Sequence, residues 1–425
     1  MNGSVHAGLA AAFRSHLPDL SIPRFTTAKQ QTPYEYSEAF QKNKQPPWIY
    51  NLTQAWKELL KEPYTGVTND GVVRSGLFQD EDLGVPVKAI VDATTKTLQI
   101  LDPEERKKVQ YPINAREWRC WSNPEFLLRP FGLRLEELPE DTAQSILGII
   151  EATLSPEGYQ KALSAMRINH FLGECCEVPT IMNKYSYNFL LFGEPSTSRA
   201  WGWSLYGHHL CLSIFIKGGN IIVAPTFTGA EPNLIDSGPW KGTQILHKEG
   251  NLGLKLMQSL TKEQQQSAQT YKLMRDPQML QTGDLKIDRW NQDDQRHLCG
   301  AFRDNRVVPY EGVKVSSFTP DQQQLVLDIA EEFLLYHPAS VRQRRKEQIR
   351  EHFHETYFSW IGDYGDEDPF YFRVQSPVII FEFDHHSGVF LTNKEPMKFH
   401  THTIVRMPNA GDYGQALRKP EEKVP

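Results

Sequence analysis

The sequence predicts an α+β protein with a mostly antiparallel sheet and helices packed around it. Two β-rich segments, residues 185–227 and 370–407, alternate apolar and polar side chains and are bounded by Gly and Pro. Before and between these segments, apolar residues recur at helical spacing. Runs of strands separated by runs of helices are typical of the α+β class.

The composition indicates a folded chain with a sizeable core. Of the 425 residues, 39% are hydrophobic and 23% are charged, which excludes disorder over most of the length. The net charge of −6 gives no general attraction to nucleic acid or to an anionic membrane. No apolar run is long enough to cross a bilayer. Five scattered cysteines without a C-x-x-C motif favour a reducing compartment, so we expect a cytoplasmic protein.

We expect three parts along the chain. Residues 1–50 are poor in pattern and rich in Pro, Gln and Lys, which indicates an arm or a loosely packed segment. Residues 51–415 are predicted to form a single large α+β domain, and residues 416–425 a C-terminal tail. No internal repeat period is evident.

The first half of the predicted domain contains both helices and strands. A helix is expected over 51–63, short strands over 71–78, 84–93 and 97–102, and a helical stretch over 103–115. Two helices fit 138–174, and the second begins with Ser155 as N-cap and Pro156 at its first position. Strands then follow over 185–193, 203–217 and 219–227, with a hairpin turn at Gly218 and Gly219.

The second half repeats the change from helices to strands. Helices are expected over 243–260, 261–274, 320–337 and 338–358. Thr261 and Gln264 have the spacing of a capping box. Strands are expected over 370–376, 377–384 and 399–407. We predict that the two β-rich segments share one sheet.

Histidines gather in the β-rich segments. His400 and His402 lie two apart, so a strand directs both imidazoles to one face. His208 and His209 are adjacent, and only one of them is expected to join that face unless the strand is bulged at Gly207. Neutral imidazole is the commonest metal ligand, and a catalytic zinc ion takes about three protein ligands and a water. The spacing therefore indicates a metal site.

Two carboxylates accompany these histidines. Glu382 and Asp384 also lie two apart on a predicted strand and share a face. Either one is a candidate fourth ligand, a partner that fixes an imidazole tautomer, or a general base. The alternative interpretation is a hydrogen-bonded polar cluster that joins the strand ends, and the spacing alone leaves both open.

Aromatic and basic residues suggest a substrate pocket. Trp201 and Trp203 are candidates to line a pocket for a flat or apolar ligand, although both also suit an ordinary core. Arg119, Arg199 and Arg406 are candidates to bind a carboxylate or phenolate of a substrate. The alternative for each arginine is a structural salt bridge.

Several segments together resemble the domain-of-unknown-function 3500 family. The run 200-AWGWSLYGHHLCLSIFIKGGNIIVAPTFTGAEP-232 is similar to the family's W-G-W-x-x-x-G-H-H-L and T-P-T-F-x-G-A-x-P motifs. Residues 369–384 and 399–414 are similar to its E-x-D and H-x-H-T segments. The similarity extends in order from about Arg116 to Gly414.

The resemblance places the family motifs on the residues singled out above. It assigns the G-H-H motif to Gly207, His208 and His209. It assigns the H-x-H-T motif to His400, His402 and Thr403, and the E-x-D motif to Glu382 and Asp384. Two positions depart from the pattern, because His385 stands where the family usually has Asn and Val405 where it usually has Trp. The resemblance implies a shared metal-binding or catalytic site but names no reaction.

We therefore expect a metal-dependent enzyme that acts on a small organic molecule by hydrolysis or lyase-type cleavage. A divalent metal, zinc or alternatively iron, would be held by His400, His402 and one or both of His208 and His209. A non-haem iron oxygenase and a non-enzymatic small-molecule binding protein with structural histidines are the alternatives. The expected partner is a small-molecule substrate, and neither nucleic acid nor membrane is expected.

Overall fold

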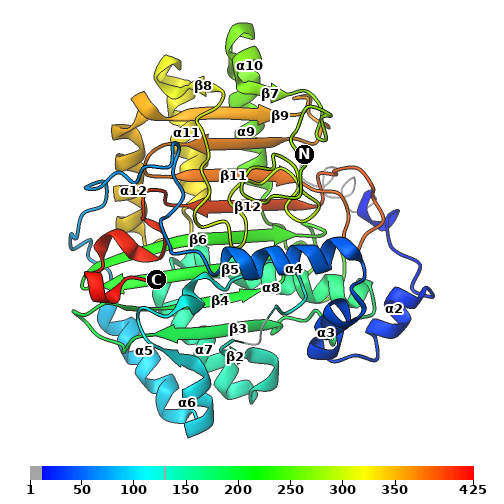
Figure 1. The fold of residues 1–425 in the computed structure, drawn as a ribbon, viewed down its shortest axis with the longest axis vertical. Helices are drawn as coiled ribbons and strands as arrows, with labels where there is room; N and C mark the ends of the chain where they lie inside the picture. The colour runs from blue at the N-terminus through cyan, green and yellow to red at the C-terminus, as the bar shows by residue number, and fades with distance from the viewer. Residues whose placement is uncertain (1–11, 129–130) are drawn as a thin grey trace.

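The computed structural model describes residues 12–128 and 131–425, so the first eleven residues of the predicted N-terminal arm lie outside it. A large mixed sheet runs through the described part of the chain (Figure 1). Its strand order is β1 (Gln110–Tyr111), β3 (Tyr187–Phe192), β4 (Trp201–Gly207), β5 (Leu210–Lys217), β6 (Asn220–Ala230), β12 (Thr401–Arg406), β11 (Ile380–His385), β10 (Tyr371–Gln375), β9 (Tyr357–Ile361) and β7 (Gln269–Tyr271). Two short strands, β2 (Leu133–Arg134) and β8 (Val313–Lys314), pair with β3 and β9.

The sheet is mostly antiparallel, and the α+β prediction is confirmed at that level. The parallel pairs are at its two ends, where β1 lies along β3 and β7 lies along β9. The two β-rich segments do share this sheet, because β6 pairs directly with β12. That pairing joins residues far apart in the chain and sets the position of the candidate site.

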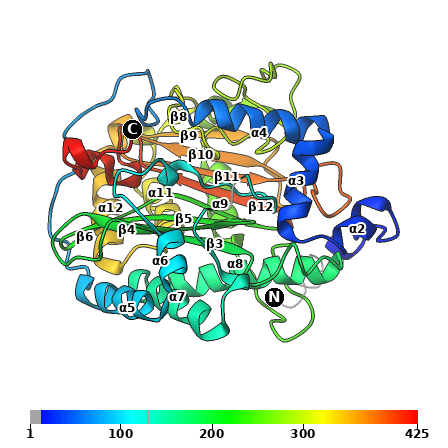
Figure 2. The same cartoon turned by 60° about the horizontal axis from the view of Figure 1, so that its bottom comes forward.

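Helices cover one face of the sheet, and loops with the N-terminal helices cover the other (Figure 2). The helices are α2 (Pro23–Ala28), α3 (Pro33–Asn43), α4 (Pro47–Leu59), α5 (Val87–Ile100), α6 (Pro103–Val109), α7 (Glu140–Thr153), α8 (Pro156–Cys175), α9 (His247–Ser259), α10 (Lys262–Ala268), α11 (Pro320–Phe333) and α12 (Ala339–Glu351). On the helix face, Trp203 of β4 donates to Thr153 of α7, and Phe381 of β11 packs on Phe333 of α11. None of the helices in the described residues combines the length and the apolar character needed to cross a bilayer.

The order of elements occurs twice along the chain. Apart from short 3₁₀ turns, α5, α6, β1, β2, α7, α8 and β3 to β6 are followed by α9, α10, β7, β8, α11, α12 and β9 to β12 in the same order. In each half the short strand after the second helix lies parallel to the first long strand. The halves meet at β6 and β12, which lie side by side at the centre of the sheet (Figure 1). The sequence analysis did not detect this repeat.

Several predicted elements are correct in type. The helices α7 and α8, the Ser155 N-cap, the Gly218–Gly219 turn and the Thr261–Gln264 capping box are all present. The helix expected over 51–63 begins earlier, at Pro47.

Several predicted elements are wrong in type or extent. The strands expected over 84–93 and 97–102 form the single helix α5, and no strand forms over 71–78. The buried residues of α5, which include Val87, Ile90 and Thr94, have helical spacing, but its threonines obscured the pattern. The helix expected over 338–358 ends at Glu351, and strand β9 follows it.

Two glycines allow α9 to lie close to the sheet. A Cβ atom on Gly253 would lie 2.1 Å from a ring carbon of Phe372, and one on Gly250 would lie 2.7 Å from Phe383. Glycine inside a helix costs about 1 kcal/mol relative to alanine, so these positions require a packing reason. The close approach of α9 to β10 and β11 is that reason.

We predict opposite effects for the same substitution in two helices. Gly253→Ala should lower the free energy of unfolding by about 1–3 kcal/mol, because Phe372 is buried and must move. Gly148→Ala in α7 meets nothing within 4 Å and should raise it by up to about 1 kcal/mol. Urea unfolding followed by circular dichroism measures both, and equal effects would contradict the packing argument.

Candidate metal centre

A two-residue turn presents His208 and His209. Strand β4 ends at Gly207 and β5 begins at Leu210, and these two residues pair with each other. The single strand expected over 203–217 is therefore wrong, because two strands joined by a two-residue turn occupy this range. His209 has a left-handed backbone with φ of 62°, and its ring stacks on that of His208 at 3.9 Å between centroids. Both imidazoles thus lie at the same end of the sheet.

The register of β12 brings the other histidines to this end. His402 pairs with Gly229 of β6 on one side and with Asp384 of β11 on the other. A Cβ atom on Gly229 would lie 2.7 Å from His209 and 2.8 Å from His402. The absence of a side chain at Gly229 therefore leaves the space that these two rings occupy.

Three imidazole nitrogens converge at this point. The Nε2 atom of His402 lies 3.0 Å from Nε2 of His400 and 3.0 Å from Nε2 of His209. A ring nitrogen has either one hydrogen or one lone pair in the ring plane, so it cannot make good hydrogen bonds to both neighbours. Two nitrogens bound to one tetrahedral zinc ion at about 2.0–2.1 Å are about 3.3 Å apart. The distances of 3.0 Å are also those of hydrogen bonds, so the feature that is compatible with a shared ion is the convergence of three nitrogens on one point.

A hydrogen bond at Nδ1 fixes the orientation of the His400 ring. Its Nδ1 lies 2.8 Å from the carbonyl of Ser387, so Nδ1 carries the hydrogen and Nε2 keeps its lone pair. Glu231 accepts hydrogen bonds from the backbone amides of residues 389–391 and holds the loop that carries Ser387. Partners of this kind orient histidine ligands in metal sites.

The structure distinguishes His208 from His209. The Nδ1 of His208 lies 2.8 Å from Oδ1 of Asn169 on α8, and burial lowers the pKa of this imidazole to about 3. His209 instead directs Nε2 at His402. Of the two predicted ligands in this turn, His209 is the one that joins the converging group.

A second histidine group adjoins the first. His297, His386 and His402 also place ligand atoms within 4.8 Å of one another, and all three are buried. The sequence analysis singled out neither His297 nor His386 as a site residue. His386 could have been identified from spacing, because it lies two residues after Asp384. His297 lies in an irregular loop, so no sequence pattern indicates that it belongs to the group.

The predicted catalytic carboxylates lie behind the first group. Glu382 accepts hydrogen bonds from the Leu298 and Cys299 amides and from the Tyr371 hydroxyl, at 2.7–2.9 Å. Burial alone would raise the pKa of Glu382, but His297 and these donors outweigh it, and the pKa is lowered. Asp384 accepts from Arg296 through Oδ1 at 2.6 Å, whereas its Oδ2 has no hydrogen-bond partner. Neither carboxylate lines the cavity of about 580 Å³ that adjoins the first histidine group.

A cavity of about 580 Å³ adjoins the converging nitrogens. His208, His209 and His402 form its inner wall, and residues of α3 and α4 with their flanking loops form much of the outer wall, among them Phe40 and Trp48. Its volume lies in the range of about 300–1,000 Å³ that is usual for small-molecule sites. The cavity gives a small ligand access to the first histidine group.

Two acidic residues in the cavity wall have raised pKa values. Burial raises the pKa of Glu125, although its carboxylate accepts a hydrogen bond from Tyr36 at 2.7 Å. Burial and the neighbouring Asp294 raise the pKa of Asp293 well above its ordinary value. Both carboxyl groups therefore keep a proton to a higher pH than an exposed carboxyl group does.

The comparisons with known proteins agree with the resemblance noted in the sequence. A family described as "Protein of unknown function (DUF3500)" matches residues 83–415. The chain belongs to the DUF3500 family. Neither the curated proteins nor the solved structures gave a match to this chain. The matched region of this DUF3500 protein includes every histidine of both groups, but α3 and α4, which supply part of the cavity wall, precede it.

The residues predicted to bind substrate lie away from the cavity of this DUF3500 protein. Trp201 and Trp203 are fully buried and donate to the Ser196 carbonyl and to Thr153. Arg199 is exposed and pairs with Glu194. The two other arginines, Arg119 and Arg406, are buried and both bind Asp304. These placements favour the structural interpretation of all five residues.

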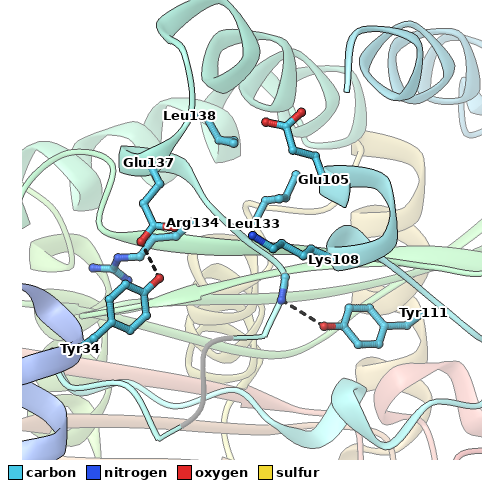
Figure 3. A pocket seen from close by; sticks show the side chains of 9 residues that line it. Tyr34, Glu105, Lys108, Tyr111, Leu133, Arg134, Glu137 and Leu138 are labelled. Atoms are coloured by element: carbon cyan, nitrogen blue, oxygen red, sulfur yellow. Dashed lines mark hydrogen bonds between the residues drawn. The ribbon is translucent and has the colours of Figure 1, made fainter. Parts of the chain in front are cut away.

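A second pocket, of about 360 Å³, lies near β2 and α6 (Figure 3). Tyr34 donates to Glu137 there at 2.5 Å, and the Gly132 amide donates to the Tyr111 hydroxyl at 3.1 Å. None of the nine described residues that line it is a histidine or a cysteine. Its chemistry therefore gives less support for catalysis than that of the histidine cavity.

We predict that Arg406 is required for folding stability. Arg406→Met should lower the free energy of unfolding by about 3–5 kcal/mol, because it leaves Asp412 buried without its cation and Asp304 with Arg119 alone. The exposed control, Arg199→Ala, should change it by no more than about 0.5 kcal/mol. Guanidinium unfolding of both variants is the measurement, and an unchanged Arg406→Met protein would contradict the structural role.

We predict that His337, a buried histidine outside both groups, makes stability depend on pH. Burial and the nearby Arg345 lower the pKa of His337 to about 3, against an ordinary value near 6.5. Between these values only the unfolded chain binds the proton, so the free energy of unfolding falls as the pH falls.

The expected contribution of His337 approaches about 1.4 kcal/mol per pH unit below pH 6. His337→Asn should remove this part of the slope, whereas His354→Asn, at an exposed histidine, should leave it unchanged. Unfolding measured in urea at pH 7, 6 and 5 distinguishes them, and parallel curves for wild type and His337→Asn would refute the prediction.

Proposed function

We propose that this DUF3500 protein is a metal-dependent enzyme that acts on a small organic molecule. His209, His400 and His402 would hold a divalent ion, zinc in the first instance. The proposal rests on the convergence of their three Nε2 atoms, with both distances to His402 at 3.0 Å, beside a cavity of about 580 Å³. We place the reaction in the class of hydrolysis or lyase-type cleavage.

The arrangement suits an open metal site. Three protein nitrogens leave one tetrahedral position for water or substrate, as in catalytic zinc sites. His209 and His402 line the cavity, so that position would face the cavity. His400 does not line it and is held from behind by Ser387. The protein thus supplies one anchored ligand and two that adjoin the substrate space.

The surrounding residues provide proton transfer and substrate binding. A bound ion in such a site lowers the pKa of water or polarises a carbonyl group. Glu125 and Asp293 line the same cavity, whereas Glu382 and Asp384 do not, so they are better placed to exchange protons with a ligand there. Phe40, and Trp48 beyond it, give the cavity an apolar wall for the body of a small ligand.

An iron oxygenase is the second candidate. His297, His386 and Asp384 together offer two imidazoles and one carboxylate, the set that non-haem iron enzymes use. This set does not line the cavity, and for this reason we prefer the hydrolytic or lyase function at the first group. None of the five cysteines forms a disulfide, which is consistent with a reducing cytoplasm.

We predict that metal binding depends on His209 but not on the adjacent His208. Untagged protein, refilled with zinc and dialysed, should contain metal by elemental analysis, and His209→Ala should lose one equivalent because it removes one of three ligands. His208→Gln is the matched control, since His208 binds Asn169 instead of the converging group, and it should retain the wild-type content.

Two results would contradict the metal centre. One is a wild-type protein without stoichiometric zinc. The other is a folded His209→Ala variant that keeps the full wild-type content. Circular dichroism of each variant shows whether the fold is intact.

A further inference from the structure

We propose that this DUF3500 protein binds a second divalent cation, held by His297, His386 and Asp384, on the side of His402 away from the cavity. The inference extends the proposed function, because His402 belongs to both histidine groups. The second site has its own ligands, however, and its test is separate from that of the first.

The first support is a concentration of buried polar atoms without partners. Oδ2 of Asp384, Nε2 of His386 and both ring nitrogens of His297 are buried and make no hydrogen bond. Each unsatisfied buried polar group costs about 1–3 kcal/mol, and native proteins contain few of them. Four such atoms from three neighbouring side chains indicate that something else satisfies them.

The second support is the distance between these atoms. Nε2 of His386 lies 3.2 Å from Oδ2 of Asp384, yet their orientation does not make a hydrogen bond. Nitrogen and oxygen ligands at about 2.0–2.2 Å from one tetrahedral zinc ion are separated by a similar distance, about 3.3 Å. The ligand atoms of His297 and His402 lie within 4.8 Å of that of His386, and Asp384 adjoins this histidine group through His386. The unpartnered Nδ1 of His402 offers a fourth donor.

The third support is that neighbouring residues orient the ligands. Arg296 binds Oδ1 of Asp384 at 2.6 Å and the His385 carbonyl at 2.7 Å, which leaves only Oδ2 of the carboxylate free. Hydrogen bonds of this kind to a metal ligand fix its orientation. Glu382 lies 4.0 Å from Nδ1 of His297, which is too far for a hydrogen bond, so it leaves both ring nitrogens of His297 free.

The chemistry of the group defines the cation. Two imidazoles and a carboxylate suit zinc, iron(II) or another divalent transition metal, and they do not suit calcium or magnesium, which prefer oxygen ligands. None of the three ligands lines the cavity, so this ion would be enclosed. An enclosed ion would join the loop that carries His297 to the end of β11 and would exchange more slowly than the ion at the cavity.

The test is zinc content of the full-length, untagged protein and of two single variants. The wild type should contain two equivalents after refilling with zinc and dialysis. His209→Ala should lose one of them at the cavity, and Asp384→Asn, which keeps an oxygen for Arg296, should lose the other. His297→Gln serves as a second variant at the enclosed site if Asp384→Asn does not fold.

The outcomes separate the two proposals. A wild type with one equivalent that His209→Ala loses and Asp384→Asn keeps overturns the second ion and leaves the proposed function intact. The reverse pattern overturns the proposed centre and leaves the enclosed ion. One equivalent lost in both variants means a single ion shared by all the histidines, which overturns the second site.

A titration of the apoprotein with cobalt(II) gives an independent reading of the wild type. Two equivalents should bind, each with visible absorption bands from imidazole ligation, and one set of bands should persist in His209→Ala. Saturation at one equivalent would overturn the inference whether or not the variants fold.

Discussion

The antiparallel pairing of β6 with β12 is the constraint on which the rest of the structure depends. It joins two halves of the chain into one sheet and sets His402 opposite Gly229, so that the β4–β5 turn and the start of β12 meet. A slip of one residue would turn His402 to the helix face. The converging imidazoles are therefore a consequence of strand register, and Gly229 is the point at which register and site geometry meet.

The loop face of the sheet is unusually polar for an interior. Asp304, Arg119 and Arg406 form one buried ionic group, and Asp384 with Arg296 forms another. Such pairs add little net stability, but removing one partner is costly, so they hold irregular loops in one arrangement. This explains how loops without regular structure, including the one that carries His297, can present side chains in fixed positions next to the sheet.

Much of the fold could be predicted from the sequence, and the site in part. Alternation and the Gly218–Gly219 turn predicted β6, and caps such as Ser155 predicted the helices, because these signals are local. The turn between β4 and β5 was missed. Helix α5 was mistaken for strands because threonine obscures apolar periodicity. His400 and His402 were found by spacing and His209 by adjacency. His297 could not be found, since only tertiary contacts bring its loop to the sheet. Arg406 and Trp203 were left between a substrate-binding and a structural role, because sequence does not reveal which face a buried side chain occupies.

The repeated topology divides the histidines of the site between two sets of elements. His209 and Gly229 belong to the first set of elements, whereas His400, His402 and His386 belong to the second. Neither set alone carries enough donors to enclose an ion at the cavity. If the two sets descend from one ancestral unit, two copies of that unit had to associate before an ion could be bound at the cavity. The present chain joins both copies covalently.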